Sequence, residues 1–170
     1  EKKLQVRWEA ETASTTVLGT AADALAIRNV EIARGRSFDE QEARGRRRVA
    51  VLGPTAVENL FGAADPLGRR IRINRIPFEV IGTTAAKGVD AGGVDQDDLI
   101  YVPLPTAMRR LLNVDHVNKI YIQAAGSDLL TQAEEEVRRV LRQRHRLGDK
   151  PDDFTIQNQA TLLATERETA

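Results

Sequence analysis

Short runs of alternating or wholly apolar residues recur along the chain. Alternation with a period of two is typical of a strand with one buried face, and a short apolar run fits a strand buried on both faces. Eight such runs predict strands, at residues 4–8, 15–18, 49–52, 70–74, 78–81, 99–102, 117–124 and 154–156. Only a short turn separates 70–74 from 78–81, so these two runs predict a β-hairpin.

The strongest helical pattern begins at Asp128. An apolar stripe at helical spacing follows it, formed by Leu129, Leu130, Ala133, Val137, Val140 and Leu141. Because predicted strands lie on both sides, the region 117–157 is expected to be a strand–helix–strand unit. Its core is expected to contain the stripe together with Ile120 and Ile122.

Several shorter helices are predicted from caps and breakers. Ser37 and Glu40 have the spacing of a capping box for a short helical turn, and Gly62 is expected to end a helix that starts near Ala56. Further helices are predicted at 21–29, after Thr106 and from Gln159 onward, whereas 41–48 and 85–98 are expected to be loops. The mixture of elements indicates an α+β fold.

Composition narrows the possible functions. The 170 residues include 25 Lys and Arg and 25 Asp and Glu, so the formal net charge is zero and a general attraction to nucleic acid is not expected. The absence of cysteine excludes disulfides and thiolate metal sites. No run approaches the roughly 18 apolar residues that a membrane span needs, so any membrane anchors are expected outside this sequence.

The familiar catalytic and cofactor motifs are missing from the sequence. Arg69 follows the glycine-containing stretch 62–68, and no Gly-Lys-Ser or Gly-Lys-Thr sequence provides a phosphate-binding loop. The two histidines, His116 and His145, lie far apart in the sequence without the partners of a zinc site, and no serine lies in a nucleophile elbow. We therefore expect no catalytic, cofactor-binding or metal-binding residues, and a domain that is not an enzyme.

Two charged segments are the candidate contact sites. Arg44 and residues 46–48 form a basic cluster, and the loop 85–98 carries several aspartates without the spacing or closing Glu of an EF-hand. Both segments are interpreted first as solvated loops and next as sites that contact a partner protein. The residues singled out for such contact are Arg46, Arg47, Asp95 and Asp97.

An ordered series of short motifs covers almost the whole chain. It comprises residues 17–29, 35–38, 49–53, 58–62, 65–68, 71–74, 78–82, 96–98, 101–104, 138–146 and 153–158. In order and spacing the series resembles the periplasmic core domain of MacB-type ABC transporter permeases. No single motif is specific, but the complete series is.

This resemblance implies a two-part architecture and a membrane setting. A porter-like βαβ subdomain would combine 1–40 with 116–170, lacking a first strand and helix, and 41–115 would form an inserted α/β subdomain of the Sabre type. The resemblance further implies a homodimeric permease of the bacterial inner membrane with a cytoplasmic ABC ATPase and this domain on the periplasmic or extracellular side. In Gram-negative exporters, a periplasmic adaptor and an outer-membrane duct join the assembly.

Two alternative interpretations remain open at this point. The domain could belong to a related permease that releases lipoproteins or signals to cell-wall hydrolases. In a different class, it could be a free-standing soluble module that binds a ligand or nucleic acid through residues 44–48.

Overall fold

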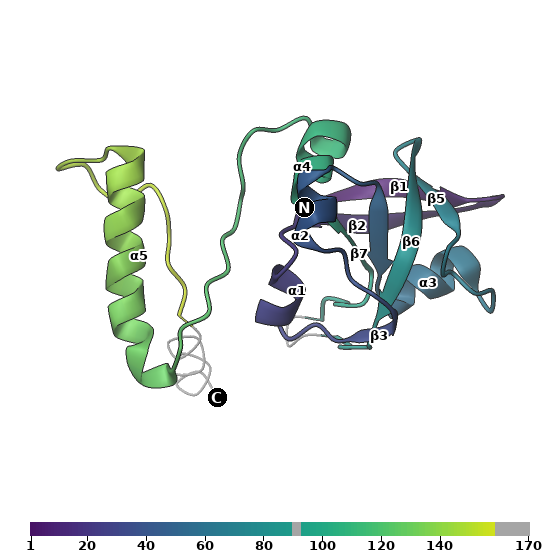
Figure 1. Cartoon of the computed structure of the whole chain (residues 1–170), viewed down its shortest axis with the longest axis horizontal. Helices are drawn as coiled ribbons and strands as arrows, with labels where there is room; N and C mark the ends of the chain where they lie inside the picture. Colours follow the sequence, from purple (N-terminus) through teal and green to yellow (C-terminus); the bar gives the residue numbers. More distant parts are fainter. Residues whose placement is uncertain (90–92, 159–170) are drawn as a thin grey trace. The chain divides into compact units, whose positions relative to one another are not determined.

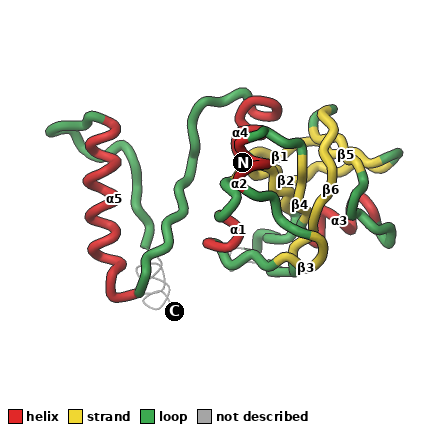
Figure 2. The backbone as a smooth tube through the Cα atoms, in the orientation of Figure 1, coloured by secondary structure: helices red, strands yellow, loops and turns green. Residues whose placement is uncertain are grey.

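A computed structural model describes residues 1–89 and 93–158 of the chain (Figure 1). The chain divides into two compact units, Glu1–Tyr121 and Ile122–Ala170, which are described separately. All strands of the described residues lie in the first unit, and the second contains the long helix α5 (Figure 2). The mixture of helices and strands is an α+β fold, as predicted.

The first unit contains seven strands and several short helices. The strands are β1 (Lys2–Trp8), β2 (Glu11–Thr20), β3 (Ile32–Gly35), β4 (Val49–Leu52), β5 (Arg70–Ile73), β6 (Ile76–Thr84) and β7 (Leu99–Pro103). The helices are α1 (Ala24–Ile27), α2 (Glu40–Arg44), α3 (Pro54–Phe61) and α4 (Leu104–Thr106), which continues into the π-helical turn η1 (Ala107–Leu112).

The strands form a sheet that closes on itself. Hydrogen-bonded neighbours run in the order β6-β4-β7-β2-β1-β5, and β5 pairs again with the first half of β6. Glu79 of β6 accordingly lies in register with Val49 of β4 on one side and with Arg70 of β5 on the other. Strand β3 pairs with the second half of β6. Closure of this kind satisfies backbone groups that an open sheet would leave at its edges.

Two apolar clusters lie on opposite sides of strand β4. Ala50 and Leu52 belong to the larger cluster, which includes residues of α3 and η1, whereas Val49 and Val51 belong to a smaller cluster with Leu25 and other residues near α1. Successive side chains of a strand point to opposite faces, so a strand covered on both faces must be apolar throughout. This explains the wholly apolar run that predicted β4.

The β5–β6 hairpin is confirmed, and its turn has an unfavourable residue. Asn74 and Arg75 have φ angles of 46° and 72°, as a two-residue type I′ turn requires. For an L-residue other than Gly or Asn, this left-handed conformation costs about 1–2 kcal/mol.

Replacing this arginine by glycine is expected to stabilise the first unit. Arg75→Gly should raise the free energy of unfolding by about 0.5–1 kcal/mol, because glycine removes the steric cost but loses more backbone entropy on folding. Urea denaturation would measure the gain. Arg75→Ala is the matched control, since it removes the same charge but keeps the strain. Equal stability of the two variants would contradict this explanation.

The predicted strand–helix–strand unit is wrong, although its helix is confirmed. Helix α5 spans Leu130–His145, after the short 3₁₀ turn η2 (Ser127–Leu129), but neither 117–124 nor 154–156 forms a strand. Ile120 and Ile122, which were expected in a core, are 62% and 55% exposed. An alternating sequence becomes a strand only when a neighbouring strand pairs with its backbone, and these segments have no such neighbour among the described residues.

Charged side chains instead hold the segment after α5 against the helix. Asp152 accepts hydrogen bonds from Arg138 and, at 2.5 Å, from Arg142. His145 lies 2.7 Å from Asp153, measured between Nδ1 and Oδ1, and its ring meets the Phe154 ring edge-on. None of the residues of α5 is fully buried. Of the predicted stripe, Leu129 and Val140 are exposed, whereas Leu130, Ala133, Val137 and Leu141 are partly buried.

Three smaller predictions also need correction. Helix α2 is capped by Asp39, not Ser37, and lies where a loop was expected. Strand β3 was not predicted, and α4 begins at Leu104 instead of being capped by Thr106. The helix predicted from Gln159 lies outside the described residues.

The structure shows where the strands of the two predicted subdomains lie, but it does not test the division into subdomains. Strands β1–β3 come from the predicted porter segment 1–40 and β4–β7 from the predicted insert 41–115, and all seven share one sheet. The assembly of 1–40 with 116–170 into a porter subdomain stays a prediction, as does the boundary of the insert.

Candidate interaction surfaces

Arg46 and Arg47 lie just after helix α2, with both side chains exposed. Their backbone is fixed, because the Arg47 N–H donates to the Glu42 carbonyl at 2.9 Å and the Arg47 carbonyl accepts a 3.0 Å hydrogen bond from the buried Thr106 hydroxyl. The two guanidinium groups are therefore presented to solvent from a fixed base. Their role in partner contact stays a prediction.

Helix α2 is itself anchored by a clamp at its N-terminus. The Glu42 carboxylate accepts hydrogen bonds from the Arg36 guanidinium at 2.7 and 2.9 Å and from the Asp39 backbone N–H at 3.2 Å. In return, the Asp39 side chain accepts from the Glu42 backbone N–H, which completes a capping box. The hydrogen bond from Arg36, and next that from the Asp39 backbone, lower the pKa of Glu42.

We expect Glu42→Gln to reduce the free energy of unfolding by about 1 kcal/mol at pH 7, because it removes the charge-assisted pairing with Arg36. Because the folded pKa lies below the unfolded value near 4.3, the wild-type carboxylate stabilises above that pH and loses this contribution as pH falls through the folded pKa. The stability difference between variant and wild type should therefore be largest near neutral pH and shrink in acid. Urea denaturation at several pH values measures it.

Glu40→Gln is the control for this clamp. Glu40 is exposed and forms an ion pair with Arg44, four residues along the helix, so its replacement should change stability by only a few tenths of a kcal/mol. A stability difference for Glu42→Gln that stayed the same from neutral to acidic pH would contradict the clamp.

Asp95 and Asp97 organise the loop between β6 and β7. Asp97 is only 8% exposed, and its two carboxylate oxygens accept hydrogen bonds from the backbone N–H groups of Lys87 at 2.7 Å and Gly88 at 2.9 Å. Asp95 is exposed and accepts from the Asp97 backbone N–H at 2.8 Å. That bond, and next one from the Thr55 hydroxyl, lower the pKa of Asp95. The expectation of a solvated acidic loop is therefore wrong for Asp97.

The two predicted contact pairs lie at opposite ends of β4. Arg47 precedes strand β4, whereas Gly53, which follows β4, packs against the Asp97 carbonyl. A strand rises about 3.3 Å per residue, so the four residues of β4 separate the pairs by more than 10 Å.

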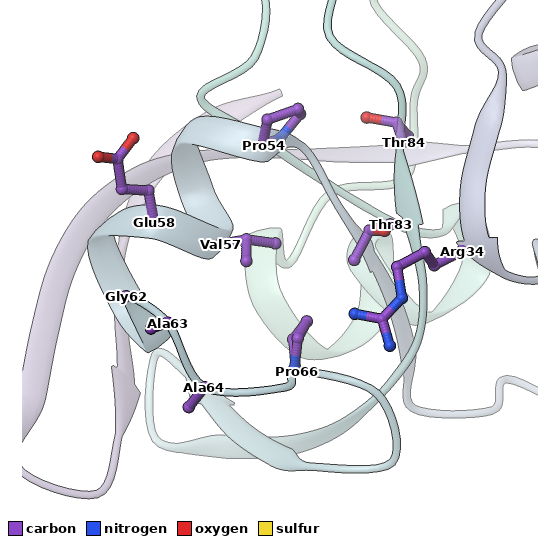
Figure 3. Close-up of a pocket in the computed structure, with 10 residues that line it drawn as sticks. All are labelled: Arg34, Pro54, Val57, Glu58, Gly62, Ala63, Ala64, Pro66, Thr83 and Thr84. Carbon is purple, nitrogen blue, oxygen red and sulfur yellow. The ribbon is translucent and has the colours of Figure 1, made fainter.

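A groove of about 650 Å³ beside α3 was not predicted from the sequence (Figure 3). Figure 3 shows Val57 of α3 on one side and Arg34 and Thr83 on the other. Its remaining lining residues are Pro54, Glu58, Gly62, Ala63, Ala64, Pro66 and Thr84. Arg34 is paired with Asp65 at 3.0 Å, and the lining has no histidine, cysteine or serine. The lining does include the carboxylate-bearing Glu58 and two threonines, Thr83 and Thr84.

The part of the chain that the structure describes contains no group of three His, Cys, Asp or Glu side chains arranged to hold a metal ion. Among these residues, no helix is long and apolar enough to cross a bilayer.

The comparison with known families identifies this domain. Residues 2–140 match the MacB-like periplasmic core domain family. Because the match covers most of the chain, the protein belongs to this family, and the resemblance seen in its sequence motifs is confirmed.

Individual relatives agree with this assignment. The macrolide export ATP-binding/permease protein MacB of Chlorobium phaeobacteroides is 36% identical over 149 residues, which cover 88% of this chain and 22% of that protein. The MacB protein of Chlorobaculum tepidum is 40% identical over 146 residues, covering 85% and 22%. The chain therefore spans about a fifth of the length of these relatives.

A solved structure supports the fold. The periplasmic region of MacB from Actinobacillus actinomycetemcomitans matches with a TM-score of 0.78 and 23% identity, covering 99% of this chain and 73% of that one.

Proposed function

We propose that this chain is the extracytoplasmic part of an ABC transporter permease and couples ATP hydrolysis elsewhere in the protein to substrate export. The observation that carries the proposal is the family match over residues 2–140, together with relatives named as ATP-binding/permease proteins. In this proposal the domain is not an enzyme and holds no cofactor of its own. The complete protein lies in the bacterial inner membrane, with this domain on its outer side.

The packing of the first unit supports a mechanical role. Its core includes Val6, Ile71 and Val102, each 0% exposed and each on a different strand of the closed sheet. Close-packed interiors have low compressibility and transmit displacement. A displacement applied to one side of this closed sheet is therefore transmitted to the other side with little loss of amplitude.

The proposed partners follow from the same family membership. They are a second permease subunit, a cytoplasmic ABC ATPase and, in a Gram-negative exporter, a periplasmic adaptor and an outer-membrane duct. Nucleic acid is not among them, in keeping with a net charge of zero.

Distance measurements between subunits would test this mechanism. The chain has no cysteine, so Asp115→Cys places a single spin label in this domain, on an exposed residue of the first unit. In the full-length protein in lipid, the distance between the two labels is expected to change between the nucleotide-free and ATP-bound states. A variant unable to bind ATP is the control. Unchanged distances in a protein with full ATPase activity would overturn the coupling.

A further inference from the structure

Three arginines line a hollow of about 260 Å³ where β1 meets β5. The hollow is lined by Arg7, Glu9, Arg70 and Arg72, all exposed, and is called the arginine hollow below. Arg7 and Arg72 are direct partners across the antiparallel β1–β5 pair. Arg70 lies two residues from Arg72 on β5, so both side chains point to the same face of the sheet.

Among the residues that the structure describes, the arginines of the arginine hollow outnumber the acids named beside them, Glu9 and Glu79. Like charges directly opposite each other across a strand pair are destabilising. Within residues 1–89 and 93–158, none of these three arginines forms an ion pair with a carboxylate, taking 4.0 Å between nitrogen and oxygen as the limit. Arg7 donates through Nε to the Glu9 backbone carbonyl at 2.7 Å. The neighbouring acids are Glu9, in the lining, and Glu79, in register with Arg70, so a surplus of positive charge remains.

We propose that the arginine hollow binds an extended acidic segment of a partner protein, with carboxylates at alternate positions. Arg70 and Arg72 are alternate residues of one strand, so their Cα atoms are about 6.6 Å apart. Alternate side chains of an extended partner segment have the same separation. A guanidinium group can bind a carboxylate through two parallel hydrogen bonds, so each arginine matches one acidic residue. This inference does not depend on the proposed export function.

A pair of short peptides tests both charge and spacing. One is Thr-Glu-Thr-Glu-Thr-Glu-Thr, and the other has the same composition with its three glutamates consecutive, which an extended chain directs to alternating faces. Titration of the isotope-labelled 170-residue chain, followed by the arginine Nε–Hε NMR signals, should shift those of the arginine hollow. The alternating peptide is expected to bind about fivefold more tightly than the consecutive one.

Charge-removing variants provide the second part of the test. Arg70→Gln with Arg72→Gln should weaken binding of the alternating peptide about tenfold. The matched control is Arg109→Gln with Arg110→Gln, which removes two exposed arginines of the same unit and should leave binding unchanged. The first double variant should remain folded, since it removes like charges that oppose each other, and the fluorescence of Trp8 verifies this.

Three outcomes would overturn the proposal. They are equal binding of the two peptides, unchanged binding by the Arg70 and Arg72 double variant, and equally effective competition by inorganic phosphate at the peptide's concentration. The last outcome would reveal a general anion site instead of a site for an acidic segment.

Discussion

Phe78→Ala is expected to lower the free energy of unfolding of the first unit by about 3–5 kcal/mol. Phe78 is 1% exposed and lies in register with Ile71 across the β5–β6 pair, and both belong to the larger core cluster. Truncation would leave a cavity beneath the hairpin that completes the closed sheet. Because domains are stable by only about 5–15 kcal/mol, a loss of this size is a large part of the total.

Trp8 allows this loss to be measured directly. It is the one tryptophan of the chain, and its ring centroid lies 4.4 Å from that of Phe61 in the same core. Urea denaturation followed by Trp8 fluorescence should show a lower midpoint with an unchanged slope. Phe154→Ala, the same substitution in the second unit, should leave this transition unchanged. A Phe78→Ala midpoint equal to that of the wild type would show that Phe78 is not in the core.

The strands that could be predicted are those in which the pattern of apolar and polar residues reflects which faces of the strand are buried. The run 49–52 is apolar throughout because β4 is covered on both faces, and Ile71 and Ile73 alternate with arginines because only one face of β5 is buried. The turn between β5 and β6 could also be predicted from the sequence, since its two central residues lie between two runs of alternating apolar and polar residues. In each case the signal is local, and it is set by side-chain burial.

Features that depend on distant parts of the chain could not be predicted. Strand β3 has the sequence Ile-Ala-Arg-Gly with three exposed residues, so it shows no alternation and exists through its pairing with β6. Closure of the sheet likewise depends on two residues of β1 meeting β5. The opposite error occurred at 117–124, where an alternating sequence has no strand beside it among the described residues.

The surroundings of the candidate contact residues also depend on distant parts of the chain and could not be predicted from the sequence. Asp95 and Asp97 look alike in the sequence, and only the fold makes one exposed and the other buried. The arginine hollow joins Arg7 to Arg70 and Arg72, which lie more than 60 positions apart in the sequence. The basic run at 46–48 could be recognised because its residues are consecutive in the sequence. A cluster that folding brings together from distant positions has no such sequence pattern.

These surfaces suit a domain that works through contacts. Arg46 and Arg47 at one end of β4, the loop held by Asp97 at the other, and the arginine hollow all lie on the first unit, whose core consists of two apolar clusters on either side of β4. In the proposed permease, a partner bound at any of these surfaces would move together with the closed sheet as one body. The separation of the surfaces allows different partners to bind without competing for the same residues.

Asp97 provides the sharpest distinction between a contact residue and a structural one. Asp97→Ala is expected to lower the free energy of unfolding by about 2–3 kcal/mol, because it leaves the backbone N–H groups of Lys87 and Gly88 without their charged acceptor. Urea denaturation followed by Trp8 fluorescence would measure the loss. A residue that served only to contact a partner could be replaced with no change in the stability of the isolated chain.

Two further substitutions complete this comparison. Asp95→Ala should cost less, about 0.5–1 kcal/mol, since its carboxylate is exposed and its hydrogen bonds from the Asp97 backbone and the Thr55 hydroxyl are open to solvent. Asp115→Ala removes an acid that is fully exposed and should leave stability unchanged within a few tenths of a kcal/mol. If Asp97→Ala proved as stable as Asp115→Ala, the carboxylate would not hold this loop, and its assignment as a contact residue would become the better explanation.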